Sequence, residues 1–247
     1  MFRELAALHG IEFHFVESLE HEETLNTLHA MKPDLVLCLF WGAVVQESAI
    51  ECVRLGFVNL HGGLLPRFRG NACANWAILT GQDEMGVSIH YMDGGKLDSG
   101  PILAQATLPI TQTTVVEELF EGTMQVGGAL IVDMLRDLES GIDPIAEPQD
   151  ESKALRCYPR LPEYGMIDWS QPATQIDRHI RSLGPPYGYA YTYRGVEKIE
   201  VLKAAPVDHQ GDYLAEPGHI IAIGGQGSIL VATGSGVLDV QTIRRSG

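Results

Sequence analysis

The segment VNLHGGLLPRFRG, residues 58–70, indicates where a buried strand ends and a functional turn begins. If residues 57–61 are extended, alternate side chains share a face, so Asn59 and His61 point together while their neighbours enter the opposite layer. The two glycines that follow let the backbone turn tightly at the carboxyl end of the strand. Open α/β sheets bind their ligands at that end. If the fold is α/β, the segment therefore predicts a site at the end of this strand.

Short apolar runs on both sides of this segment alternate with helical patterns. This alternation is typical of an α/β domain with a largely parallel sheet. The predicted strands are the runs IEFHFV (11–16), DLVLCLF (34–40), FVNLH (57–61), GVSIHYMD (86–93) and PILAQATL (101–108). Predicted helices begin near Leu25, Val44, Asn71 and Val115.

The pattern changes after a polar segment with prolines, GIDPIAEPQDESK (141–153), which has the composition of a linker. An amphipathic helix follows Pro172, and then five alternating runs separated by glycine turns predict a small β-barrel. These runs are YAYTY (189–193), KIEVL (198–202), HIIAI (219–223), SILVAT (228–233) and VLDVQTI (237–243). We expect a catalytic α/β domain over residues 1–151, and a linker helix with a β-barrel over residues 152–247.

The negative charge of the chain is concentrated in its first part. The formal net charge is −15, and residues 1–155 hold 8 Lys and Arg against 23 Asp and Glu, whereas the remainder holds 9 of each. A field of this sign repels phosphate backbones, and the sequence shows no local basic patch that would favour extended nucleic-acid binding. The longest apolar run, at residues 35–45, is about half the ~20 residues of a membrane span. We expect a cytoplasmic protein without a membrane segment.

No residue pattern predicts a metal site. The four cysteines are widely spaced and lack the spacing of zinc ligands, so we expect reduced, mostly buried thiols. His90 and Asp93 could be ligands at i and i+3, but no further ligands cluster with them.

Asn59 and His61 suit the chemistry of acyl transfer. An amide can donate a hydrogen bond to a carbonyl oxygen that becomes an oxyanion, and an imidazole can accept a proton near neutral pH. A carboxylate that orients the histidine could come from Asp93 or Asp98, in the glycine-rich segment YMDGGKLDSGPI (91–102). The residues alone leave the choice between these two carboxylates open.

These segments together resemble the folate-dependent formyltransferases, the methionyl-tRNA formyltransferase-like family that transfers a formyl group from 10-formyltetrahydrofolate to an amine. The resemblance rests on NLHGGLLPRFRG (59–70), GVSIHYMDGGKLDSGPI (86–102) and IDW (167–169), and covers about residues 2–242. It implies a Rossmann-like formyltransferase domain followed by an OB-like β-barrel, and it needs no metal. It also implies that Asn59, His61 and Asp98 form the catalytic trio.

The resemblance further implies which residues bind the donor and the acceptor. The implied folate-binding residues are Phe40, Trp41, Gly42, Ala43, Val44, Leu65, Tyr91, Met92, Asp93 and Leu97. The implied acceptor-binding residues are Gly62, Gly63, Arg67, Arg69 and Asn71. The two arginines near a helix start could meet a diphosphate, although surface salt bridges would explain them equally well.

Three functions remain open. The pattern is closest to nucleotide-sugar N-formyltransferases such as UDP-4-amino-4-deoxy-L-arabinose formyltransferase. One reason is the negative charge of the chain. The other is the segment CYPRLPEYGMIDWS (157–170), which resembles the arginine- and proline-bearing segment of sugar enzymes. The alternative is a methionyl-tRNA formyltransferase, with tRNA as partner. A formyltetrahydrofolate hydrolase or a non-catalytic folate-binding fragment is the third, and the intact trio argues against it. A homodimer is compatible with each of them.

The N-terminus departs from this family. Its members usually begin with a glycine-containing strand, a helix and a second strand, whereas this chain starts at what resembles the following helix. We expect either a piece of a longer protein or a rebuilt sheet, because removing central strands would expose unpaired strand edges.

Overall fold

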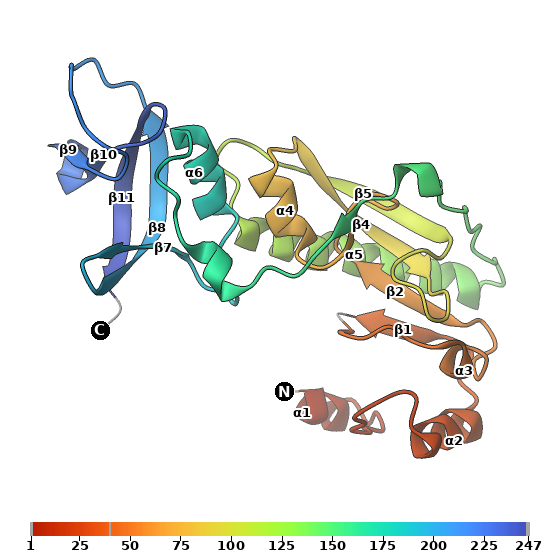
Figure 1. The fold of residues 1–247 in the computed structure, drawn as a ribbon. Helices are drawn as coiled ribbons and strands as arrows, with labels where there is room; N and C mark the ends of the chain where they lie inside the picture. Colours follow the sequence, from red (N-terminus) through yellow and green to blue (C-terminus); the bar gives the residue numbers. More distant parts are fainter. Residues whose placement is uncertain (1, 40, 246–247) are drawn as a thin grey trace.

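The computed structural model describes residues 2–39 and 41–245, which form an N-terminal α/β unit and a C-terminal β unit (Figure 1). The helices are α1 (Phe2–Leu8), α2 (Glu22–Met31), α3 (Glu47–Ile50), α4 (Cys73–Leu79), α5 (Val116–Glu139) and α6 (Ala173–Arg181). The strands of the first part are β1 (Val36–Leu39), β2 (Phe57–His61), β3 (Arg69–Gly70), β4 (Glu84–Tyr91), β5 (Ile102–Pro109) and β6 (Arg156–Cys157). Those of the second part are β7 (Ala190–Arg194), β8 (Glu197–Val207), β9 (Ile220–Ile223), β10 (Ile229–Ala232) and β11 (Val237–Arg245).

The N-terminal sheet has the strand order β1-β2-β4-β5. β1 and β2 run parallel, but β2 with β4 and β4 with β5 are antiparallel. The prediction of a largely parallel sheet is therefore wrong for these strands. β4 turns back directly into β5 through the loop at residues 92–101, and strands joined by such a short loop run antiparallel.

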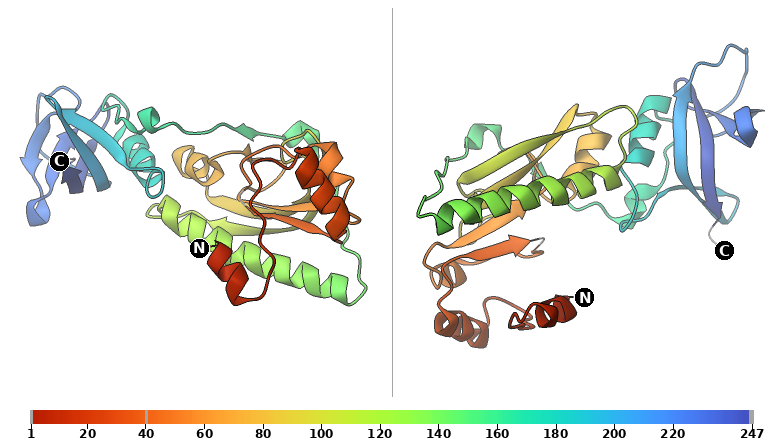
Figure 2. Two further views of the ribbon diagram at one scale, coloured as in Figure 1. Left: turned by 90° about the horizontal axis from the view of Figure 1, so that it is seen from below. Right: turned by 180° about the vertical axis from the view of Figure 1, so that it is seen from behind.

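Helix α5 covers one face of this sheet (Figure 2). Val58 and Leu60 of β2 belong to the buried cluster that α5 completes. The helix comes close at Gly127, where an added Cβ would lie 2.5 Å from Cδ1 of Leu60. Because side chains alternate along a strand, Asn59 and His61 leave β2 on the opposite face, as the sequence predicts.

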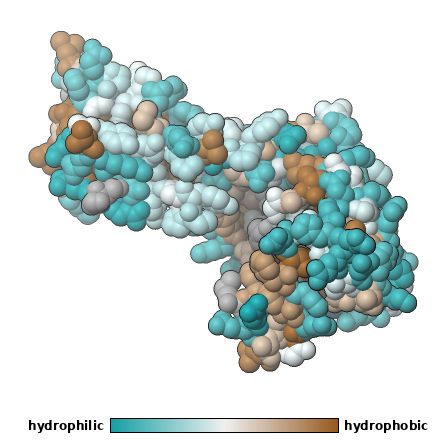
Figure 3. All heavy atoms as spheres, turned by 60° about the horizontal axis from the view of Figure 1, so that its bottom comes forward, coloured by the Kyte–Doolittle hydropathy of each residue, from teal (hydrophilic) through white to brown (hydrophobic). Residues whose placement is uncertain are grey.

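The N-terminal segment packs loosely beside the sheet. Residues 11–16 contain no strand, so the predicted first strand is wrong; among the described residues no strand lies alongside to pair with it. Apolar side chains gather on the surface of this part of the molecule, seen at the lower right of Figure 3. Leu8 is 78% exposed and Phe15 is 79% exposed. β1 lies at the edge of the sheet nearest to this segment.

The C-terminal unit consists of α6 against a five-stranded antiparallel sheet of order β7-β8-β11-β10-β9. The predicted helix and all five predicted strands are confirmed, and Ile176, Ile180 and Leu183 face Val201 and Leu238 in one buried cluster.

Three further features concern the linker, the cysteines and the helices. The linker between the units is fastened to the first unit where β6 pairs with β3. The cysteines are free thiols, and three of them are buried. Within the described residues, no helix is long and apolar enough to cross a membrane.

Candidate functional site

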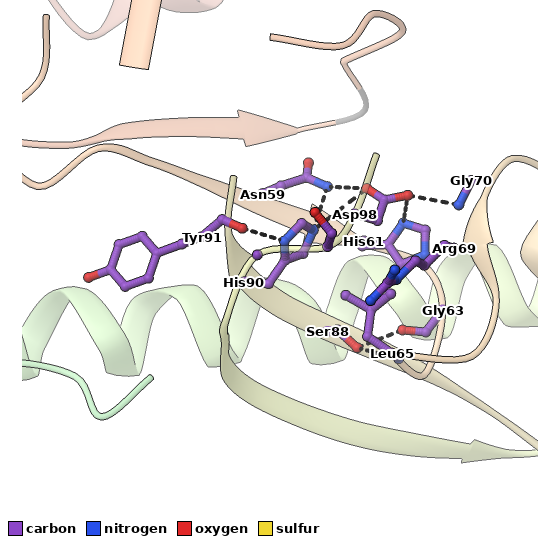
Figure 4. Close-up of polar contacts among 12 residues, drawn as sticks. Asn59, His61, Gly63, Leu65, Arg69, Gly70, Ser88, His90, Tyr91 and Asp98 are labelled. Atoms are coloured by element: carbon purple, nitrogen blue, oxygen red, sulfur yellow. Dashed lines mark hydrogen bonds and ion pairs between the residues drawn. The ribbon is translucent and has the colours of Figure 1, made fainter. Parts of the chain in front are cut away.

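Two neighbouring strands present polar side chains on one face of the N-terminal sheet. In the antiparallel register of β2 and β4, Asn59 lies opposite His90 and His61 lies opposite Ser88. Asp98 reaches this face from the loop between β4 and β5 (Figure 4). The structure therefore brings Asn59, His61 and Asp98 together.

His61 has a polar partner on each side of its ring. Nε2 lies 2.6 Å from the carbonyl oxygen of Phe68, and Nδ1 lies 3.6 Å from Oδ2 of Asp98. The residue is only 7% exposed. Burial lowers the pKa of His61 and outweighs the opposing influence of Asp98 and of the Phe68 carbonyl. The imidazole is therefore neutral near pH 7, and a neutral ring that donates from Nε2 keeps a basic lone pair on Nδ1.

Asp98 is held by its backbone as well as by its carboxylate. Its φ of 49° places it in the left-handed region, which Asp tolerates better than most residues. The Gly70 N–H donates to Oδ2 at 2.7 Å, and the Gln149 side-chain amide donates to the Asp98 carbonyl at 2.9 Å. Burial acts to raise the pKa of Asp98, but the polar groups around the carboxylate, among them the Gly70 N–H, outweigh it, and the net pKa is lowered. The carboxylate therefore stays ionised.

Asn59 is the amide of the group. Its Nδ2 lies 3.1 Å from Nε2 of His90 and 3.5 Å from Oδ1 of Asp98. The donor end of the amide is thus turned toward the space beside Asp98 and His61 (Figure 4).

The glycine turn after β2 is shaped around His61. An added Cβ on Gly63 would lie 2.6 Å from Nε2 of His61 and would also meet the Phe68 carbonyl oxygen. The Ser88 hydroxyl anchors the same turn, because it donates to the Gly63 carbonyl at 2.6 Å and accepts the Leu65 N–H at 3.1 Å. Only glycine fits at position 63 without moving the imidazole.

A cavity of about 610 Å³ opens beside these residues. It is lined by the trio, by the segment after β1, by the start of α4 and by side chains of α5 and the linker. Of the predicted folate-binding residues, those that line it are Trp41, Gly42, Ala43, Val44 and Leu97. Phe40 lies outside the described residues.

The remaining predicted folate-binding residues lie elsewhere. Leu65 and Met92 pack into the interior, and Tyr91 packs beside the cluster under α5. Asp93 accepts a hydrogen bond from Ser99 at 3.2 Å and lies 3.7 Å from the Lys96 ammonium. It is therefore Asp98, and not Asp93, that faces His61.

The predicted acceptor-binding residues separate in the same way. Gly62 and Asn71 line the cavity, whereas Gly63 lies beneath the His61 ring. Arg67 is exposed, with its guanidinium 5.6 Å from the centre of the Phe68 ring. Arg69 is 9% exposed and has other partners, described next.

Arg69 ties the site to the linker. Its guanidinium donates to Glu151 at 2.7 Å and to Oε1 of Gln149 at 2.7 Å. Gln149 in turn donates to the Asp98 and Gly100 carbonyls. Arg69 thus supports the Asp98 loop instead of lining the cavity.

The sequence pointed to His90 only as a possible metal ligand, and it did not point to Gln149, Ser88 or the backbone groups of Phe68 and Gly70. Ser88 and His90 alternate along β4 in the same way as Asn59 and His61 alternate along β2. This alternation is the sequence signal for Ser88 and His90, but using it requires knowledge of the antiparallel register.

Known proteins share this fold and sequence pattern. A family model described as formyl transferase matches residues 11–135, and one described as formyl transferase, C-terminal domain, matches residues 161–247. Methionyl-tRNA formyltransferase of Trichlorobacter lovleyi is 35% identical over 247 residues, which are 99% of this chain and 75% of the relative.

Solved structures are similar in fold. HypX from Aquifex aeolicus in complex with tetrahydrofolic acid has a TM-score of 0.67 at 20% identity, over 92% of this chain and 38% of the HypX chain. The N-formyltransferase from Helicobacter canadensis, in complex with folinic acid and dTDP-3-aminofucose, has a TM-score of 0.67 at 15% identity, over 98% of this chain and 82% of the other.

Proposed function

The chain belongs to the formyl transferase family as a folate-dependent N-formyltransferase, and we propose that its acceptor is the α-amine of methionyl-tRNA. The observation that carries this acceptor is the 35% identity to a methionyl-tRNA formyltransferase along 99% of the chain. The solved structures related to sugar formylation are at most distantly similar in sequence and support the fold alone. The charge and the segment at residues 157–170 favour a nucleotide-linked sugar as acceptor. The sequence relatives favour methionyl-tRNA, and we give them more weight.

The cavity suits a folate donor. Its volume of about 610 Å³ is within the range of sites for drug-sized ligands, and its lining includes residues 41–44 and the apolar residues Leu97 and Met124. The trio forms the polar end of this cavity. We propose that the folate ring lies between the segment after β1 and Leu97, with its formyl group beside the trio.

Asn59, His61 and Asp98 each have a separate role in the formyl transfer that we propose. When bound, 10-formyltetrahydrofolate supplies a formyl carbon that an amine can attack. Asn59 donates from Nδ2 to the carbonyl oxygen as that oxygen gains negative charge, which is worth about 3 kcal/mol for one preorganised donor. Neutral His61 accepts the proton of the attacking amine at Nδ1, and the Asp98 carboxylate 3.6 Å away stabilises the imidazolium. The imidazolium would then return this proton to the folate nitrogen as the bond between that nitrogen and the formyl carbon breaks. The Phe68 carbonyl holds the ring in this orientation through Nε2.

A nucleotide-linked amino sugar is the second candidate. The observation in its favour is the excess of 23 acidic over 8 basic residues in positions 1–155, which disfavours a polyanionic acceptor. The diphosphate role of Arg69 no longer supports it, because that guanidinium is engaged by Glu151 and Gln149.

One assay separates the two acceptors. The protein is incubated with 10-formyltetrahydrofolate and either methionyl-tRNA or a panel of nucleotide-linked amino sugars, and products are analysed by mass spectrometry. We expect the formyl mass on the methionyl group, and none with uncharged tRNA. Formylation of a sugar alone would replace the proposed acceptor, and folate turnover without any formylated amine would indicate a hydrolase.

A further inference from the structure

We propose that His90 is a positioning residue that fixes which end of the Asn59 amide faces the reacting carbonyl. This inference rests on the proposed role of Asn59 as the oxyanion donor and adds a fourth side chain to the trio. His90 is 1% exposed and lies directly across from Asn59 in the sheet. Its ring is arranged edge to face with the His61 ring, with 6.2 Å between the ring centroids. It is too deeply buried to touch the acceptor, so it acts through its neighbours.

The proton of His90 is assigned by its backbone contact. Nδ1 lies 2.7 Å from the carbonyl oxygen of Tyr91, and a carbonyl oxygen only accepts hydrogen bonds. Nδ1 therefore carries the hydrogen, and in a neutral imidazole Nε2 is then an acceptor. Oδ1 of Asp98 is 3.7 Å from Nε2, which is beyond hydrogen-bond distance, so no proton on Nε2 is required by that contact.

An acceptor at Nε2 decides the orientation of Asn59. The two ends of an amide have nearly the same shape, and the hydrogen-bond partners decide which end points where. With Nδ2 of Asn59 at 3.1 Å, Nε2 of His90 receives one amide hydrogen. The second hydrogen then points toward Asp98, where the contact is longer, at 3.5 Å. The reversed amide would place its oxygen against a lone pair of His90 and beside a carboxylate.

This orientation matters for the reaction. A hydrogen directed at a weakly held, 3.5 Å contact can turn to a developing oxyanion at little cost, whereas a reversed amide offers that oxyanion only another negative oxygen. His90 thus keeps a donor, and not an acceptor, at the polar end of the cavity. Removing His90 leaves only the longer contact with Asp98 to hold the donor end in place, so the reversed and inactive orientation becomes more populated.

The test compares kcat with KM in two variants at position 90. We expect His90→Leu to lower kcat about 10- to 100-fold, a share of the effect of one oxyanion donor, with the KM of donor and acceptor unchanged. His90→Gln restores an acceptor near the position of Nε2 and is expected to recover part of that loss. Ile89→Val, on the opposite face of β4, serves as a packing control and should leave kcat unchanged.

A double-mutant cycle separates positioning from general support. In an Asn59→Ala background, His90→Leu should cause little further loss, because the amide that it orients is gone. Full additivity, or a His90→Leu variant with the wild-type kcat, would overturn the inference. The proposed function is tested separately. If the wild-type protein transfers the formyl group and Asn59→Ala does not, the proposed function stands whatever His90→Leu does.

An NMR measurement on the wild-type protein tests the inference even if the variants fail to fold. Nitrogen NMR of histidine-labelled wild-type protein should show the neutral Nδ1–H tautomer for His90. An Nε2–H tautomer or a doubly protonated ring would contradict the inference, whatever the acceptor of the enzyme.

Discussion

Nδ1 of His61 lies 3.6 Å from Oδ2 of Asp98, so a strand residue and a loop residue meet at one point of the cavity. The loop reaches that point because the Gly70 N–H and the Gln149 side chain hold Asp98 from the other side. The catalytic chemistry that we propose depends on this contact, since it places a negative charge beside the nitrogen that receives the proton.

Replacing Asp98 with Asn tests the charge without changing the shape. We expect Asp98→Asn to lower kcat about 10²- to 10⁴-fold, because the imidazolium of His61 loses its stabilising partner. We also expect a modest loss of thermal stability, because the lowered pKa of Asp98 means that the fold favours the ionised carboxylate. A kcat within a few-fold of wild type would remove Asp98 from the trio.

Replacing Gly63 with Ala tests the position of the imidazole. The added Cβ would lie 2.6 Å from Nε2 of His61, so the ring must move away from the Phe68 carbonyl. We expect Gly63→Ala to lower kcat strongly. The matched control is Gly128→Ala in α5, where a Cβ meets nothing within 4 Å and the substitution should stabilise the helix by up to about 1 kcal/mol. Normal activity in Gly63→Ala would show that His61 tolerates displacement.

The stability of the protein should fall in mildly acidic solution. Burial lowers the pKa of His61, so below about pH 6.5 the unfolded chain binds more protons than the folded chain, and the free energy of unfolding decreases as the pH falls. His179 contributes in the same direction, because burial also lowers its pKa. Urea unfolding at several pH values should show a shallower decline in His61→Gln than in wild type. An unchanged decline would contradict a neutral, buried His61.

Arg69 should matter for support and not for binding of the acceptor. Arg69→Lys keeps the charge but cannot contact Gln149 and Glu151 at the same time, so we expect a lower melting temperature and a moderately reduced kcat. The KM of the acceptor should stay the same, with exposed Arg67→Lys as the control. A raised acceptor KM in Arg69→Lys alone would restore the binding role that the sequence suggests.

Much of the site could be predicted because it follows from alternation along one strand. Asn59 and His61 share a face of β2 in the structure as they do in the sequence pattern, and Asp98 occupies the expected loop. The C-terminal strands were also predictable, because glycine turns separate clear alternating runs. The segment at residues 11–16 has the same apolar alternation, but no strand lies beside it among the described residues. Whether an alternating segment forms a strand depends on a neighbouring strand as well as on its own sequence.

The rest depends on contacts between distant segments. His90 meets Asn59 only through the antiparallel register of β2 and β4, and a parallel sheet would place them differently. The Phe68 carbonyl and the Gly70 N–H are backbone groups, which any residue type carries. From the sequence alone, Arg69 resembles a surface cation, because its partners Gln149 and Glu151 lie far away in the linker.

The most direct test of the central claim is single-turnover formyl transfer to methionyl-tRNA by the wild-type protein, beside Asn59→Ala, His61→Ala and Asp98→Ala. The product is measured as formylmethionine released from the tRNA. We predict a formylated product with wild type and its loss in all three variants, each of which should remain folded by circular dichroism. Undiminished transfer in the variants, or no formylmethionine from the wild-type protein, would contradict the proposed mechanism or its acceptor, respectively.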